Sequence, residues 1–297
     1  MNSSPSEQHI NISNYQCAVY EWKGTGPTIL FCHATGFHAR VWDQVIQKLE
    51  GIHCVSVDLR GHGKSTKTPP PYPWDSFVPD IEKITETLEL STVIGVGHSM
   101  GGHVITKVAA RNPDKFAGLV LCDPSLFSSD RYSSKSKSEQ LGNSHPVAKR
   151  RNNWNSPKQM FNRLKDHPNF GRWEKRVLED YCNYGLAQTE NGDFSLSCPP
   201  SVEASMYGAY IDPIIIEEIS EYNRPVRIIL AKSRKPNQSF SDFGPSVSRE
   251  DLEHIFPSAI SNRYDDLSHF LPMENSQLVA DEIRLLTCSI NIKHQQL

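Results

Sequence analysis

The sequence predicts an α/β fold in which a mostly parallel central sheet is flanked by helices. Short apolar runs rich in β-branched residues recur along the first part of the chain: TILFC at 28–32, CVSVD at 54–58, TVIGV at 92–96 and GLVLC at 118–122. Continuous apolar strands are typical of a sheet that is buried on both faces. Helix-like segments separate the runs, and strands that alternate with helices make a parallel sheet.

Two of the helix-like segments are well defined. Before the run at 92–96, four apolar residues recur at helical spacing, which places one apolar stripe on a helix: Phe77, Ile81, Ile84 and Leu88. A second helix, HVITKVAAR, begins near Gly102 and ends before Asn112-Pro113, a pair that stops helices. Strands and helices therefore alternate through the first part of the chain.

This alternation is lost from about 126 to 222, where the chain is polar, aromatic and helix-like. Two strands and a closing helix follow: 225–231, near 259–264 and around 276–287. We therefore expect one α/β core, formed by residues 1–125 and 223–297, that is interrupted by an inserted helical cap, residues 126–222.

The bulk composition excludes some classes of function. The chain has 297 residues, a net charge of −3, 37% apolar residues and 22% charged residues, which is typical of a globular protein with a sizeable core. A charge so near zero gives no overall attraction for nucleic acid, so we expect no nucleic-acid partner. We expect a monomer or a homodimer.

The opening segment and the cysteines bear on the compartment. The segment MNSSPSEQHINISNYQ lacks the basic and apolar regions of a secretory signal, and no run approaches the roughly 18 apolar residues of a membrane span. Seven cysteines are scattered without a C-x-x-C pair, which favours buried thiols over disulfides or zinc ligands. We expect a cytoplasmic protein with no membrane span, no metal and no cofactor.

The segment 128–165 is rich in basic residues. It carries nine lysines and arginines: Arg131, Lys135, Lys137, Lys149, Arg150, Arg151, Lys158, Arg163 and Lys165. The acidic residues of the same segment are Asp130 and Glu139. We favour a solvated face of the insertion, which is the usual meaning of a charge run. The alternative is that this segment attracts an anionic substrate or partner.

The stretch GHSMG at 97–101 follows a strand-like run and precedes a helix, which is the context that a G-x-S-x-G nucleophile turn requires. Ser99 must then adopt a strained backbone, and Gly97 and Gly101 remove Cβ atoms that would collide at the turn. The helix start directs N–H groups towards the same place, which favours a developing oxyanion.

Four separated stretches together resemble the α/β-hydrolase fold superfamily: FCHATGF at 31–37, DLRGHGKS at 58–65, GHSMGG at 97–102 and LSHFLPMENS at 267–276. The resemblance implies a serine nucleophile at Ser99 and an α/β-hydrolase fold with a helical cap. It does not identify a substrate, because one fold hosts many reactions.

By position in this family, the N–H groups of Thr35 and Met100 would form the oxyanion hole. The family usually has histidine-glycine-x-proline at the first turn, and this chain departs from it with Ala34 and Gly36. We expect His33, His98 and Trp154 to contact the substrate, although His33 can alternatively hydrogen-bond the backbone of its own turn.

The family places its catalytic histidine last in the chain, beyond the final strand. His269 fits this position, because His254 lies in a helix-like segment and His294 lies in the tail. Serine needs such a base to become a nucleophile.

The position of the acid is the main departure from the family. Members commonly place an aspartate after the strand that here is PVRIILAKS, but the next residues, RKPNQSF, contain no carboxylate. A minority places it after the preceding sheet strand, where Asp123-Pro124 follows GLVLC. We favour Asp123 over Asp242 of the long loop; an aspartate-proline pair also occurs as a simple turn cap.

A serine nucleophile favours acyl chemistry. We expect a serine hydrolase that cleaves a carboxylic ester or lactone of a small to medium apolar substrate through an acyl-enzyme. A C–C bond hydrolase or a perhydrolase would use the same triad. A ligand receptor of the same fold with slow turnover is the alternative from another class.

Overall fold

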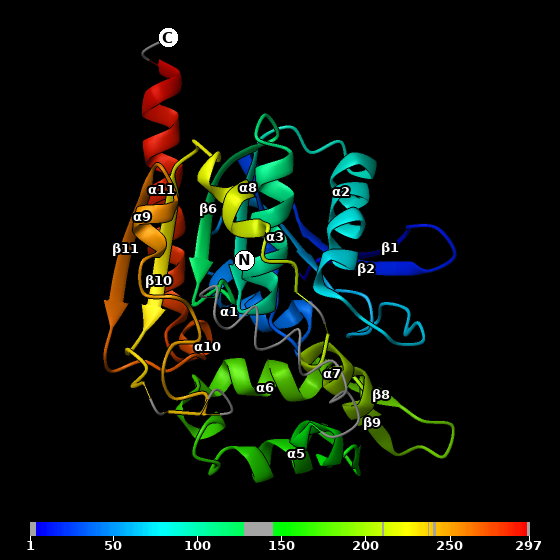
Figure 1. Ribbon diagram of the computed structural model, residues 1–297. Helices are drawn as coiled ribbons and strands as arrows, with labels where there is room; N and C mark the ends of the chain where they lie inside the picture. The colour runs from blue at the N-terminus through cyan, green and yellow to red at the C-terminus, as the bar shows by residue number, and fades with distance from the viewer. Residues whose placement is uncertain (1–3, 128–144, 210, 237, 240–241, 296–297) are drawn as a thin grey trace.

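The computed structural model describes residues 4–127, 145–209, 211–236, 238–239 and 242–295, with the backbone alone for 291–295 (Figure 1). Within these residues, eight strands form one sheet in the order β1-β2-β4-β3-β5-β6-β10-β11. Their bounds are β1 Ser6–Asn11, β2 Gln16–Trp22, β3 Thr25–Cys32, β4 Ile52–Val57, β5 Val93–His98, β6 Phe116–Cys122, β10 Val226–Ala231 and β11 Ala259–Tyr264. Every neighbouring pair from β4 to β11 is parallel, which confirms the predicted α/β fold.

The antiparallel strands β1 and β2 at one edge extend the sheet beyond the predicted strands. In β1, SEQHIN, only Ile10 is apolar and it is also the only buried residue of that strand. Such a strand has neither a continuous apolar run nor a regular alternation, so its sequence carries no strand signal. Pairing with β2 determines its conformation instead.

Helices cover both faces of the sheet (Figure 1). On one face, α3 (Met100–Arg111) packs against α2 (Val78–Thr87) and α8 (Ile215–Ser220). On the other face, α1 (Asp43–Ile46) packs against α11 (Ser276–Gln295). Side chains of the central strands alternate between two apolar clusters, one under each layer of helices. Short helical turns complete the core: η1 Ala39–Trp42, η2 Trp74–Phe77, α9 Leu252–Ile255 and α10 Leu271–Glu274.

Two helices differ from their predicted limits. Helix α3 begins at Met100, before the predicted start at Gly102. Helix α11 continues to Gln295, because apolar residues such as Ile283 and Ile290 keep facing the core. Helix α8, for which the sequence predicted no limits, packs on α3.

Between β6 and β10, residues 145–209 lie across the carboxyl ends of the strands (Figure 1). We call residues 145–209 the insertion. Its helices are η3 Pro146–Lys149, α5 Pro157–Leu164, η4 Phe170–Arg172, α6 Lys175–Tyr184 and α7 Pro200–Tyr207. It also contains an antiparallel sheet in the order β7-β9-β8, formed by β7 Asn153–Trp154, β8 Leu186–Gln188 and β9 Phe194–Leu196. The sequence did not indicate this small sheet, because strands this short leave no periodic pattern. The limits 126 and 222 stay a prediction.

Two further expectations concern membrane spans and cysteines. None of the described helices is both long and apolar enough to cross a membrane. All seven cysteines are free thiols, and six of them are buried. A cytoplasmic location stays a prediction.

Replacing Gly101 with alanine tests whether the close approach of α3 to β3 determines the fold. A Cβ atom there would lie 2.3 Å from the carbonyl oxygen of Cys32 and 2.5 Å from that of His33. We expect Gly101→Ala to lower the free energy of unfolding by about 3 kcal/mol, although alanine is the better helix former by about 1 kcal/mol. Urea unfolding followed by circular dichroism measures the change.

Gly51→Ala is the matched control. Gly51 has φ +83° and no atom within 4 Å of an added Cβ, so only backbone strain of about 1 kcal/mol is expected. Equal losses in the two variants would contradict the steric argument.

Candidate active site

Ser99 lies at the turn between β5 and α3. Its backbone has φ 54° and ψ −119°, a conformation that residues other than glycine rarely adopt. A Cβ atom on Gly97 would lie 2.5 Å from the carbonyl oxygen of Gly101. Only glycine permits this approach, so the structure contains the strained strand-to-helix turn that the sequence indicated.

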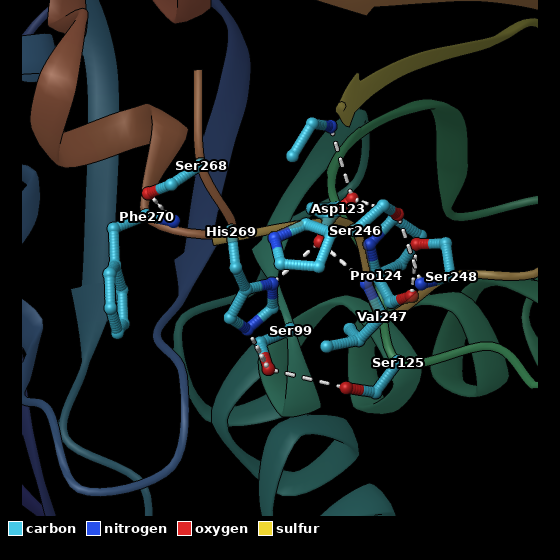
Figure 2. A network of polar contacts seen from close by, with 12 residues as sticks. Ser99, Asp123, Pro124, Ser125, Ser246, Val247, Ser248, Ser268, His269 and Phe270 are labelled. Atoms are coloured by element: carbon cyan, nitrogen blue, oxygen red, sulfur yellow. Dashed lines mark hydrogen bonds and ion pairs between the residues drawn. The ribbon is translucent and has the colours of Figure 1, made fainter. Parts of the chain in front are cut away.

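Ser99, His269 and Asp123 form a hydrogen-bonded chain (Figure 2). Oγ of Ser99 lies 3.0 Å from Nε2 of His269, and Nδ1 of His269 lies 2.6 Å from Oδ2 of Asp123. An ionised carboxylate only accepts, so Nδ1 of His269 carries the proton and donates it. Nε2 is thereby left to accept from the Ser99 hydroxyl, which is the tautomer that general-base catalysis requires.

Asp123 directly follows β6 and is fully buried, with a φ of 42°. The hydroxyl of Ser246 donates to its Oδ1, as does the N–H of Ala231 at 3.2 Å, and the N–H of Val247 donates to Oδ2 at 3.1 Å. Burial alone would raise the pKa of Asp123, but the hydrogen bonds and charge of His269, with Ser246 and Val247, hold it below its usual value. Asp123 is therefore a carboxylate at neutral pH.

Asp242, the alternative acid, is exposed and lies elsewhere in the loop after β10. Its carboxylate accepts from the N–H of Gly244 at 2.8 Å and from the amide of Gln238 at 2.6 Å. The structure thus brings Asp123, and not Asp242, to Nδ1 of His269. Both aspartates were compatible with the sequence. Tertiary contacts, which the sequence does not reveal, distinguish between them.

The turn after β3 carries the first expected oxyanion donor. Thr35 lines the cavity above Ser99, and its hydroxyl lies 3.3 Å from the sulfur of Met100. Within the part of the chain that the structure describes, the N–H groups of Thr35 and Met100 have no carbonyl partner. The N–H of Gly36, in contrast, donates to Nε2 of His62 at 3.0 Å.

The expectation that His33 contacts the substrate was wrong. His33 is fully buried and lies outside the cavity lining. Its Nδ1 donates to the carbonyl of Ala34 at 2.8 Å, and its Nε2 accepts from the N–H of Leu59 at 3.0 Å. Both ring nitrogens therefore hydrogen-bond backbone groups, which is the alternative role that the sequence left open.

His98 also lies outside the cavity lining, although it was expected to contact the substrate. It is fully buried, and its Nε2 donates to the backbone carbonyl of His269 at 2.7 Å. Burial, together with the nearby His269, lowers the pKa of His98 to about 3, so the ring is neutral at physiological pH. Its contact positions the loop that carries His269.

The buried carboxylate of Glu274 also holds the loop that carries His269. Glu274 accepts from the N–H of Ser268 at 3.1 Å and from its hydroxyl (Figure 2 shows Ser268 beside His269). Arg172, which belongs to the insertion, donates from Nε to Oε1 of Glu274 at 2.9 Å. The insertion is thereby tied to the loop of His269.

Ser125 is a neighbour of the triad that the sequence did not single out. Its Oγ lies 3.2 Å from Oγ of Ser99, and its N–H donates to the Ser99 carbonyl at 2.9 Å. The available signal was its position two residues after Asp123, at the end of β6. The turn that brings Asp123 to His269 also brings Ser125 to Ser99.

A cavity of about 570 Å³ opens above Ser99 and His269, between the core and the insertion. Its apolar walls include Phe37, Trp154, Met160, Phe170, Phe243 and Phe270. Trp154 thus lies where a substrate-contacting residue was expected. The volume of this cavity and its largely apolar lining are typical of a site for a small organic molecule.

Part of the basic segment also reaches the cavity. Arg150, Arg151 and Arg163 line it. Arg131, Lys135 and Lys137 lie outside the described residues. Among the residues that are described, no group of three or more His, Cys, Asp or Glu side chains is arranged to hold a metal ion.

Comparison with known proteins agrees with this architecture. A family model described as the alpha/beta hydrolase fold matches residues 27–163. The crystal structure of E-2-(acetamidomethylene)succinate hydrolase superposes with a TM-score of 0.72 at 20% identity, covering 95% of this chain and 98% of that one. The chain therefore has the α/β-hydrolase fold.

Curated relatives match over a shorter segment. Lipase LipV of Mycobacterium tuberculosis is 35% identical over 111 residues, which cover 36% of this chain and 41% of the relative. The 2-(acetamidomethylene)succinate hydrolase of Mesorhizobium japonicum is 33% identical over 102 residues, 34% of this chain and 37% of the relative. The chain thus spans about two fifths of the length of the curated relatives it matches.

Replacing each of the two candidate acids with asparagine tests which carboxylate orients the ring of His269. In Asp123→Asn the ring loses its anionic partner and the preference for the productive tautomer, so we expect the hydrolysis rate to fall by about two to four orders of magnitude. Asp242→Asn is the matched control and should change the rate less than about twofold, because the described hydrogen bonds of its carboxylate come from Gln238 and Gly244 of its own loop. Initial rates on a p-nitrophenyl ester measure both, and the reverse pattern would move the acid to the loop.

Proposed function

We propose that this protein is a serine hydrolase that cleaves a carboxylic ester or lactone of a small to medium apolar substrate. The observation that carries the proposal is the hydrogen-bonded chain from Ser99 through His269 to Asp123 at the floor of the cavity. The names of two relatives, a lipase and a hydrolase, support hydrolysis as the reaction.

In the first half of the proposed reaction, Nε2 of His269 takes the proton of the Ser99 hydroxyl while Oγ attacks the substrate carbonyl carbon. Asp123 stabilises the imidazolium that forms. The tetrahedral intermediate collapses when His269 gives its proton to the departing alcohol oxygen, which leaves an acyl group on Ser99.

In the second half, His269 takes a proton from water, whose oxygen attacks the acyl carbon. Collapse of this intermediate returns the proton to Oγ of Ser99 and releases the carboxylic acid. The histidine therefore transfers one proton in each direction during each half, and the enzyme is regenerated.

The negative charge on the carbonyl oxygen needs donors that already point towards it. The N–H groups of Thr35 and Met100 suit this role, because neither donates to a carbonyl within the described chain. Met100 begins α3, so the N-terminal end of a helix dipole adds to the stabilisation. Such preorganised donors are worth about 3 kcal/mol each in comparable enzymes.

The apolar walls determine which substrates the cavity favours. Aromatic rings from the core and the insertion meet there, for example Phe37 with Tyr181, at a centroid distance of 5.5 Å. An apolar acyl chain gains free energy by leaving water for such a site, about 0.8 kcal/mol per CH₂ group. We therefore expect short to medium acyl chains to be preferred over acetate.

Ser99→Ala tests the proposal directly. We expect the variant to lose hydrolysis of p-nitrophenyl butyrate by at least about three orders of magnitude, because the nucleophile is gone. Ser220→Ala, which changes an exposed serine on α8, is the matched control and should retain the parent rate. Hydrolysis by Ser99→Ala at the parent rate would overturn the proposal.

The time course of the parent protein separates an enzyme from a slow ligand receptor of the same fold. Sustained release of p-nitrophenol after an initial burst supports the hydrolase. One equivalent of release followed by no further turnover would instead indicate a receptor whose acyl group is not hydrolysed.

A further inference from the structure

The described side chains that line the cavity carry more positive than negative charge. Three arginines of the insertion face it, Arg150, Arg151 and Arg163, whereas Glu203 is the only carboxylate among its lining residues in the described chain. A site meant only for neutral apolar esters has no need of this excess of positive charge, since a guanidinium near apolar walls loses part of its hydration.

Glu203 neutralises only one of the arginines. Its Oε2 lies 2.5 Å from a terminal nitrogen of Arg150, and the other terminal nitrogen of Arg150 donates to the Tyr181 hydroxyl at 3.2 Å. The Glu203 side chain is 5% exposed and packs beside Gly36 of the turn after β3. This pair is thus an internal, electrically balanced contact close to the expected oxyanion hole.

Arg151 and Arg163 have no carboxylate partner among the described residues. Arg151 is nevertheless held in place: its guanidinium lies 4.2 Å from the ring centroid of Trp154 and donates to the Asn153 carbonyl at 2.7 Å and to the Gln159 side chain at 3.0 Å. These bonds position the cation without cancelling its charge.

Arg163 comes from the inner face of α5. Met160, Arg163 and Leu164 all line the cavity, and residues three and four apart lie on one side of a helix. Both Arg151 and Arg163 are exposed to solvent as well, so they lie where the cavity opens, while the aromatic walls and Ser99 lie deeper. The cavity therefore has an apolar interior and a cationic entrance.

We propose that the substrate is an ester whose acyl chain ends in a carboxylate, and that Arg151 and Arg163 bind this carboxylate while Ser99 attacks the ester carbonyl. This inference rests on the proposed hydrolase function and adds a terminal carboxylate to the otherwise apolar acyl chain. Guanidinium groups suit it, because they bind carboxylates through paired, charge-assisted hydrogen bonds.

Two aryl esters of equal chain length test the proposal. The p-nitrophenyl monoester of glutaric acid carries the terminal carboxylate, and p-nitrophenyl valerate has a methyl group in its place. We expect the glutarate ester to have the higher kcat/KM by about tenfold or more, and this preference should shrink in about 0.5 M NaCl because salt screens exposed charges. Equal kcat/KM values for the two esters would overturn the proposal.

Variants assign the preference to the two arginines. Arg151→Gln combined with Arg163→Gln should lower the ratio of kcat/KM on the glutarate ester to kcat/KM on the valerate ester by about tenfold or more. Lys158→Gln is the matched control, since Lys158 is a cation on the same helix that does not line the cavity. A glutarate preference that survives in the double variant would also overturn the proposal.

A binding measurement separates this inference from the hydrolase proposal. Titration calorimetry of Ser99→Ala with monomethyl glutarate, with and without the two arginine substitutions, requires no turnover. A dissociation constant that rises about tenfold in the arginine variant supports the carboxylate site even if hydrolysis is absent. An unchanged constant, or no binding, overturns it even if Ser99 hydrolyses neutral esters.

The anionic group could instead belong to the leaving group, as in a coenzyme A thioester. Butyryl-coenzyme A distinguishes the two: if its hydrolysis depends on Arg151 and Arg163 while that of the glutarate ester does not, the acyl carboxylate is excluded.

Discussion

The close approach of α3 to the strand ends is the constraint on which the rest of the structure depends. An added Cβ on Gly101 would collide with the carbonyl groups of Cys32 and His33, and one on Gly102 would lie 2.7 Å from Cβ of Pro124. The first turn of α3 is thus wedged between the turn that supplies Thr35 and the turn that supplies Asp123. Because Ser99 immediately precedes this turn of helix, the packing of Gly101 and Gly102 positions Ser99, the N–H groups of Thr35 and Met100, and Asp123 relative to one another.

The electrostatics around this turn follow from burial. His33, His62 and His98 are fully buried, and loss of hydration lowers the pKa of each ring, so these histidines are neutral donors and acceptors for the backbone. Asp123 is equally buried, yet the hydrogen bonds that it accepts hold its pKa low. A single buried carboxylate is therefore directed at Nδ1 of His269, while the cationic groups lie on the insertion at the other side of the cavity.

Much of this arrangement could be predicted from local sequence. Continuous apolar runs identified the central strands, and GHSMG between a strand and a helix identified the turn at Ser99. The position of His269 followed from chain order once the resemblance was seen. Three features could not be read in this way. Strand β1 is almost wholly polar, the choice of Asp123 over Asp242 depends on contacts between segments over a hundred residues apart, and the backbone roles of His33 and His98 depend on what encloses them.

Covalent labelling with a fluorophosphonate tests the central claim most directly, because it reports the activated nucleophile without requiring a substrate. Intact-protein and peptide mass spectrometry should find one adduct, on Ser99, and the labelling rate should fall by at least about two orders of magnitude in His269→Ala. An adduct on another residue, or labelling of Ser99 at the same rate without His269, would contradict the account.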